Sequence, residues 1–371
     1  MKFTVYIFIL SIALTACQSK INKEETSTVE EISEVVEEPK SNAVFAKAQT
    51  DAVRSLDGED AADDPAFWFN SSSPKNSLVI GSNKREGIEV YTLPGKRIAY
   101  YPTGRINNVD VALKVAFGTN GELIDIVAGS NRTYNRIDIW SIDSTGKEFE
   151  LISDTTMRAK LQEVYGFCLY RASEKDVYAI VNGKSGKVEQ YKLWRSELGV
   201  GFELVGEFAA PSQTEGSVVD TVANKFYLGV EELGILVFDI VDDQMKEGKL
   251  IPLSGEDNED LMFDIEGLCI HYASKTERYL FASSQGNNRY AVFDISKEPE
   301  YLDYFTIEEQ NGIDGTSETD GIDVFSGNLG SDYPNGIFMV QDGYNTNIEG
   351  DTLTQNFKIV SVEEILKLIK N

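Results

Sequence analysis

Residues 78–93 read LVIGSNKREGIEVYTL, in which an apolar run, a short polar turn and a second apolar run follow one another. Two apolar runs separated by small and charged residues are typical of antiparallel strands joined by a tight turn. The pattern recurs along the chain, at residues 124–142, 177–193, 225–240, 279–295 and 336–362. Helical periodicity is scarce, and the last ten residues, VEEILKLIKN, are the one stretch where we expect a helix.

The spacing of these repeats predicts the architecture. One residue at the turn of each repeat can be compared: Lys84, Arg132, Lys184, Glu231, Gln285 and Asp342. The intervals are 48, 52, 47, 54 and 57 residues, and a period of about 50 with several strands per unit is the mark of a β-propeller. We therefore predict an all-β fold over residues 51–371, a six-bladed β-propeller with a short C-terminal helix, whose turns face a common central site. A β-sandwich is the alternative, but it would not repeat at this spacing.

The composition excludes several classes of function. The chain has 371 residues, and its 61 acidic and 34 basic side chains give a net charge of −27. This charge argues against a nucleic-acid-binding protein, because such a protein needs a basic face. At first sight it also argues against any polyanionic substrate. His271 is the single histidine, which excludes enzymes that need two or more. The chain has no G-x-S-x-G elbow, no G-x-x-x-x-G-K-[ST] loop and no Cys followed six positions later by Arg. The chemistry of an enzyme is therefore left to carboxylates, metals, Lys, Arg or Tyr.

The amino terminus predicts export. In residues 1–16, Lys2 precedes an apolar run too short to span a membrane comfortably, which is typical of a signal peptide. The LTAC sequence ending at Cys17 resembles a bacterial lipobox, in which Cys17 carries the lipid; an ordinary signal peptide is the alternative. Residues 17–50 are rich in Glu, Ser, Thr and Lys, so we expect a flexible acidic tether. We thus expect a protein anchored by lipid to the bacterial outer membrane, on its periplasmic or cell-surface face.

The two remaining cysteines, Cys168 and Cys269, lie in the apolar, strand-like runs YGFCLY and GLCIHY. We expect buried free thiols there rather than a disulfide, even in an oxidising compartment.

The acidic residues are unevenly distributed. They gather in residues 57–64 and 314–323, and Asp264 and Glu266 stand two apart, on the same side of an extended segment. Packed carboxylates repel one another unless cations lie between them, and Ca²⁺ takes 6–8 oxygen ligands. With almost no imidazole in the chain, a hard cation is favoured over zinc or copper. A solvated acidic surface is the alternative, but these acids adjoin Gly, Pro and turns rather than alternating along one face.

Basic residues stand at three consecutive turns, Lys84, Arg132 and Lys184. They could be ion-pair partners in a very acidic protein. With bound Ca²⁺, however, they would make one pocket locally positive, because a bound cation inverts the local electrostatics. That removes the objection to a polyanionic ligand.

Several longer motifs resemble the β-propeller phytases in order and spacing. They are AADDPAFW (61–68), GRINNVDV (104–111), GSNR (129–132), EVYGFCLY (163–170), SQTEG (212–216), DIEGL (264–268), SSQGNNRY (283–290), GTSETDGIDV (315–324), QDG (341–343) and NFK (356–358). The resemblance covers about residues 51–371. It implies six blades, secretion, dependence on Ca²⁺ and hydrolysis of phytate, myo-inositol hexakisphosphate.

The resemblance also implies site residues. Calcium ligands are expected at Asp63, Asp64, Pro65, Asn107, Asn108, Val109, Asp110, Glu215, Glu231, Asp264, Glu266, Gln285, Asp314, Gly315 and Asp320. Phosphate-binding residues are expected at Lys84, Arg132, Tyr165 and Lys184, and catalysis is expected to depend on Glu215, Glu231, Glu266 and Asp314. Around the fourth turn, where the family commonly has an acidic doublet or triplet, this chain has Val230-Glu231-Glu232. After SQTEG, where the family tends to continue with an acidic run, this chain has only Asp220. These departures put one peripheral metal site in doubt.

The expected mechanism is attack of a metal-activated water on the phosphate without a phosphoenzyme. The expected partner is phytate, as its calcium salt, with no nucleic acid, and a closed propeller has no free edge that demands oligomerisation. Two alternatives stay open. One is a non-catalytic, calcium-stabilised surface propeller that binds a glycan or a protein. The other is a calcium-dependent lactonase or phosphodiesterase, which the lone His271 disfavours.

Overall fold

The computed structural model describes residues 42–56 and 59–370. The expected signal peptide, the lipid-bearing Cys17 and most of the expected tether lie outside these residues. Within the described part, no helix is both long enough and apolar enough to cross a bilayer.

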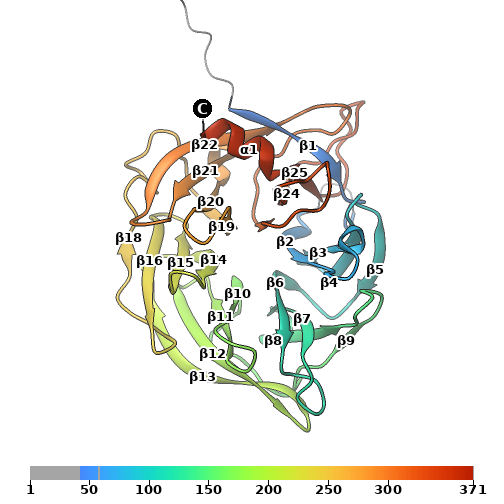
Figure 1. Ribbon diagram of the computed structural model, residues 1–371, viewed down its shortest axis with the longest axis vertical. Coiled ribbons are helices and arrows are strands. Elements are labelled where there is room, and N and C mark those ends of the chain that lie inside the picture. Colours follow the sequence, from blue (N-terminus) through green and yellow to red (C-terminus); the bar gives the residue numbers. More distant parts are fainter. Residues whose placement is uncertain (1–41, 57–58, 371) are drawn as a thin grey trace, which may run out of the picture. The chain divides into compact units, whose positions relative to one another are not determined.

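The described chain is built of β-strands, as predicted, and five sheets follow one another around a common centre (Figure 1). The first sheet contains β2 (Ala62–Trp68), β3 (Leu78–Asn83), β4 (Gly87–Thr92) and β5 (Arg97–Tyr101). The second contains β6 (Ile106–Val115), β7 (Ile124–Asn131), β8 (Arg136–Ile142) and β9 (Phe149–Leu151). The third contains β10 (Phe167–Arg171), β11 (Val177–Asn182), β12 (Lys187–Ser196) and β13 (Gly199–Ala209). The fourth contains β14 (Thr214–Asp220), β15 (Lys225–Val230), β16 (Gly234–Val241), β17 (Gln244–Met245) and β18 (Lys249–Leu250).

The fifth sheet has eight strands and joins the two ends of the described chain. Its order is β19 (Ile265–Tyr272), β20 (Arg278–Ser284), β21 (Arg289–Asp294), β22 (Glu300–Glu308), β1 (Ala43–Gln49), β25 (Asn356–Ser361), β24 (Ile337–Asp342) and β23 (Ile322–Phe325). Two short 3₁₀ turns, η1 (Pro74–Asn76) and η2 (Gln285–Asn287), and the helix α1 (Val362–Ile369) complete the described elements. The helix confirms the prediction for the C-terminal residues.

Strand β1 corrects one predicted boundary. Residues 43–49 were expected in the flexible tether, yet they pair in parallel with β22 and antiparallel with β25. Val44 and Ala46 are buried in the apolar cluster that also contains Phe305 and Val360. The folded domain therefore begins before residue 51, because the backbone of β1 is hydrogen-bonded on both of its edges.

Apolar clusters fill the interface between each sheet and the next. One cluster, for example, joins Trp68 of β2 to Trp140 of β8, and another joins Phe357 of β25 to Tyr91 of β4. Sheets that are covered on both faces have strands that are buried throughout, such as β3, β11 and β20. Cys168 and Cys269 are buried free thiols, as predicted.

The innermost strands β2, β6, β10, β14, β19 and β23 contact one another in that order and return to β2. They surround the centre of the ring (Figure 1). The residues at the beginnings of these strands therefore meet at one end of the central channel.

Candidate metal and phosphate site

The six turn residues chosen from the repeats occupy equivalent places in the fold. Lys84, Arg132, Glu231 and Gln285 directly follow β3, β7, β15 and β20, Lys184 lies two residues beyond β11, and Asp342 ends β24. The first five belong to the contacts described below. Asp342 does not, since it lies with Lys358 in a separate cluster.

A break in strand register presents acidic and amide side chains at this end. The pairing of four inner strands with their neighbours shifts at Ala62/Pro65, Ile106/Val109, Thr214/Ser217 and Ile265/Leu268. The residues inside these breaks are Asp63, Asp64, Asn107, Asn108, Glu215, Gly216, Glu266 and Gly267. Bulges re-aim side chains next to functional sites, and here the same break recurs around the ring.

Glycines allow the inner strands to approach closely at these breaks. A Cβ atom on Gly216 would lie 2.0 Å from the carbonyl oxygen of Glu266, and one on Gly321 would lie 2.3 Å from Oδ1 of Asp64. The motifs TEG and TDGID therefore place carboxylates and glycines alternately for a steric reason.

Three buried glutamates form the centre of the site. Glu215, Glu231 and Glu266 each offer a carboxylate oxygen, and these oxygens all lie within 4.8 Å of one another. Burial raises the pKa of Glu266 well above its usual range, and the carboxylates of Glu215 and Glu231 raise it further. Burial likewise raises the pKa of Glu231 to about 7. Carboxylates this close together disfavour one another's ionised form, so a cation between them is needed to keep all of them ionised.

Two oxygen atoms in this cluster have no partner. Oε1 of Glu231 and Oε2 of Glu266 are buried and accept no hydrogen bond from residues 42–56 or 59–370. A buried carboxylate oxygen without a donor is costly, so these atoms fit a bound cation. The donor set is purely oxygen, which suits Ca²⁺ or Mg²⁺ rather than zinc or copper. Asp264 lies close enough to raise the pKa values of both Glu231 and Glu266 through its charge.

Lys84 neutralises one edge of the site. Its Nζ lies 2.6 Å from Asp60, 3.0 Å from Asp63 and 2.7 Å from Asp320. Burial alone would lower the pKa of Lys84, but these three carboxylates together raise it above its usual range. The amide of Gln285 donates to Asp320 at 2.7 Å. Lys84 is thus partnered by three carboxylates.

Asn107 connects that edge to the glutamates. Its Nδ2 donates to Asp63 at 2.9 Å and to Glu215 at 2.7 Å, while its Oδ1 accepts from Nη1 of Arg132 at 3.0 Å. Burial raises the pKa values of Asp63 and Glu215. One amide therefore ties the acidic centre to a guanidinium.

Arg132, Tyr165 and Lys184 form the cationic side of the site. The guanidinium carbon of Arg132 lies 5.2 Å from the centre of the Tyr165 ring, and Nζ of Lys184 lies 4.5 Å from it. Two cations placed on one aromatic ring are a suitable arrangement for phosphate oxygens. All four predicted phosphate-binding residues, Lys84 included, thus border the acidic centre.

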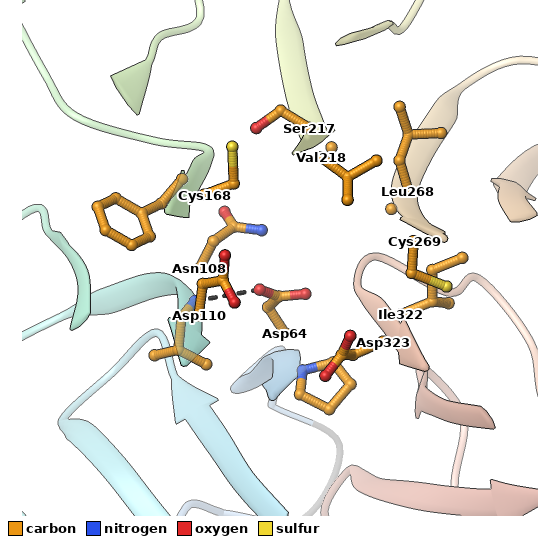
Figure 2. Close-up of a pocket in the computed structure, with 15 residues that line it drawn as sticks. Asp64, Asn108, Asp110, Cys168, Ser217, Val218, Leu268, Cys269, Ile322 and Asp323 are labelled. Carbon is orange, nitrogen blue, oxygen red and sulfur yellow. Dashed lines mark hydrogen bonds between the residues drawn. The ribbon is translucent and has the colours of Figure 1, made fainter. Parts of the chain in front are cut away.

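The channel below this end holds a second group of predicted ligands. Asp64, Pro65, Asn108, Val109 and Asp110 line a cavity of about 50 Å³ together with Asp323 and both free thiols. Figure 2 shows the three Asp carboxylates and the thiols around this space. Burial raises the pKa of Asp110 to about 6 and that of Asp323 to about 7. Asp323 was not predicted as a site residue, although it stands in the same DGID sequence as Asp320.

Asp314 and Gly315 lie elsewhere. Oδ1 of Asp314 is 2.5 Å from Nζ of Lys358, and its other oxygen accepts from the backbone of Thr346. Asp314 and Gly315 line a separate cleft with Tyr344. The structure therefore does not bring Asp314 into the cluster of Glu215, Glu231 and Glu266, contrary to the expectation that these four residues act together. Lys358 stands in the NFK motif and was not singled out from the sequence.

Comparison with known proteins gives a consistent result. The model of the phytase family matches residues 10–371. A curated 3-phytase of Bacillus subtilis (strain 168) is 42% identical over 328 residues, which is 87% of this chain and 84% of that protein. A solved structure of a functionally unknown protein from Desulfotomaculum acetoxidans DSM 771 aligns with a TM-score of 0.42 at 14% identity, over 64% of this chain and 70% of that one. This last similarity is too remote to support a conclusion.

Proposed function

Because the chain belongs to the phytase family, we propose that its acidic centre binds Ca²⁺ and hydrolyses phytate there. The protein is a phosphoric monoester hydrolase of the 3-phytase type. Dependence on Ca²⁺ and the roles of individual residues are our proposals. The observation that carries them is the glutamate cluster, whose buried oxygens on Glu231 and Glu266 have no hydrogen-bond partner.

The fold of the family suits this assignment, and we propose six blades. The eight-stranded sheet divides at the parallel pairing of β1 with β22 into two groups of four antiparallel strands. Together with the other sheets this gives six groups, with β1 supplying the outer strand of the last one. A strand from the other end of the described chain thus joins the two ends of the ring.

The cation would be held by Glu215, Glu231 and Glu266, with Asp63, Asp264 and Asp320 at the margins. Bound Ca²⁺ supplies positive charge to the phosphate and lowers the pKa of a water molecule. Hydrolysis of a phosphate monoester needs such charge fixed in advance, because the anionic group repels its nucleophile. The three glutamates of the cluster would repel an anionic phosphate, so a bound cation would supply the opposite charge there.

The protein's own side chains would then perform separate tasks. Arg132 and Lys184 would bind phosphate oxygens from the Tyr165 side, and Lys84 would do so from the edge that it forms with Asp63 and Asp320. Glu231 would hold the cation beside the attacking water and would take the proton of that water. The proton would reach the inositol oxygen as the phosphorus–oxygen bond breaks, leaving inorganic phosphate and a lower inositol phosphate.

The experiment that tests this function is phosphate release from phytate by the full chain at neutral pH, with and without a calcium chelator. We expect release that the chelator abolishes and added Ca²⁺ restores. Absence of release in both conditions, from a folded protein, would instead support the calcium-stabilised binding protein or a different hydrolase.

We further propose that Cys17 carries a lipid and that residues 1–16 are removed. Growth with a radiolabelled fatty acid should label the protein, and Cys17→Ser should abolish the label. Labelling that persists in this variant would contradict the anchor.

A further inference from the structure

A cleft of about 430 Å³ opens beside the cationic side of the site. It is lined by Arg132, Leu161, Gln162, Glu163, Lys184 and Ser185, from the β7–β8 and β11–β12 turns and the segment before β10. Two of its residues are cations and one is an anion. The anion, Glu163, has no role in the proposed reaction.

The cations of this cleft are unequally partnered. Lys184 lies over the Tyr165 ring and takes part in no ion pair among the described residues. Arg132 is held on two sides: Nη1 donates to Asn107, and Nε donates to Oε1 of Glu163 at 3.1 Å. Because Asn107 takes Nη1, the Nε side of the guanidinium is the side left for an anion, and Glu163 already occupies part of it.

The contact with Glu163 matters because it blocks one of the donor pairs through which a guanidinium binds phosphate. Phosphate binds Arg best through two parallel N–H donors, and the pair formed by Nε and Nη2 is one such fork. Asn107 already takes Nη1, so a phosphate that binds the Nε edge must displace the Glu163 carboxylate.

Displacement is feasible because Glu163 is loosely held. Its side chain is 38% exposed, and it forms a second ion pair at 3.4 Å with Arg105, whose side chain is 46% exposed. Exposed ion pairs of this kind contribute little to stability. The carboxylate can therefore turn away without a large cost to the fold.

We propose that Glu163 is a specificity-determining residue that competes with phosphate for Arg132. The inference rests on the proposed function, because it concerns the phosphate bound at that site. Glu163 repels inorganic phosphate, and a single phosphate ion makes few other contacts that would offset this repulsion. A substrate with several phosphates engages Lys184 and the acidic centre at the same time, so it tolerates this repulsion better. Glu163 thus favours release of inorganic phosphate over retention.

The test is the affinity of the full chain for inorganic phosphate, measured by calorimetry at a fixed Ca²⁺ concentration below the precipitation limit. In Glu163→Gln the amide oxygen can still accept from Arg132 while the charge is removed. We expect phosphate to bind about 3- to 10-fold more tightly, with a smaller gain at high salt. Glu207→Gln, which removes an exposed carboxylate paired with Lys187, should leave the affinity unchanged.

Weaker or unchanged phosphate binding in Glu163→Gln would overturn the proposal, since Glu163 would then merely position Arg132. A tighter affinity that appears equally in Glu207→Gln would overturn it as well. Neither result depends on turnover. Failure of the proposed function would instead appear as a lack of phytate hydrolysis in the wild type and in both variants.

Discussion

Two clusters of buried or partly buried carboxylates in this protein obtain positive charge in opposite ways. In the first, around Lys358, a fully buried ammonium lies 2.5 Å from Asp314 and 3.1 Å from Asp342, and it donates to Gln49 at 2.9 Å. In the second, Glu215, Glu231 and Glu266 face one another and leave buried oxygens without a partner. The first cluster contains its own cation, whereas the second needs one from solution. The number of acidic residues does not distinguish the two clusters. The presence of Lys358 in the first one does.

Glu266→Gln should have the largest effect, because it removes a charge from the cluster that needs an external cation. We expect kcat for phytate to fall by more than about 100-fold. Glu232→Gln, at an exposed neighbouring position, should keep most of its activity. Steady-state kinetics at saturating Ca²⁺ measure both, and a Glu266→Gln variant with more than half of the wild-type kcat would break the comparison.

Lys358→Met should mainly affect stability. It leaves the buried Asp342 and the partly buried Asp314 without their counter-charge, so we expect the free energy of unfolding to fall by about 3–5 kcal/mol. Urea denaturation measures this change.

Asp314→Asn is the companion variant, and it tests catalysis. If Asp314 belongs to the cluster around Lys358, kcat per folded molecule stays within about threefold of the wild type. A loss of kcat as large as that of Glu266→Gln would restore Asp314 to the catalytic set predicted from the sequence.

Lys184→Ala should have a smaller, kinetic effect. The ammonium contacts the Tyr165 ring and no carboxylate among the described residues, so its removal should not change the unfolding midpoint. We expect kcat/KM to fall by about 10- to 100-fold through loss of a charged contact to phosphate. Lys225→Ala, which breaks an exposed pair with Asp239, is the control. Equal kcat/KM values in the two variants would contradict a role of Lys184 in phosphate binding.

The pH dependence of stability should show the smallest effect. Burial raises the pKa of Glu231 to about 7 and raises those of Glu215 and Glu266. Between about pH 4.5 and 7 the folded, metal-free protein therefore holds protons that the unfolded chain releases, so its stability falls as pH rises. Ca²⁺ binds the ionised carboxylates, and the stabilisation it provides should grow with pH. Melting midpoints at pH 5 and pH 8, with and without Ca²⁺, test this. A calcium-induced shift that shrinks with pH would contradict it.

Much of the fold could be predicted because the repeats are local. The two strands around each turn lie close in sequence, and their turns alone set the period of about 50 residues. Strand β1 was missed for the opposite reason. Its sequence AVFAKAQ follows an acidic segment, and its partners β22 and β25 lie at the far end of the chain. Pairing between distant segments leaves no local pattern to recognise.

The site was predicted less completely. The motifs around Asp63, Glu215 and Glu266 come together at one end of the channel, because the same register break recurs in the inner strands. Asp314 and Asp320 stand close in one motif, yet the loop between β22 and β23 directs them to different clusters. Asp314 rather than Asp320 pairs with Lys358, because Lys358 on β25 lies beside it in the fold. Lys358 is distant in the sequence, so the sequence does not reveal this pairing.

The most direct test of the account is the number of Ca²⁺ ions bound by the wild type and by a Glu215→Gln, Glu266→Gln double variant, measured by calorimetry on protein that circular dichroism shows to be folded. We expect the double variant to lose at least one calcium site together with phytate hydrolysis, while Lys358→Met loses none. Unchanged calcium binding in the double variant would contradict the claim that the unpartnered glutamates hold the cation.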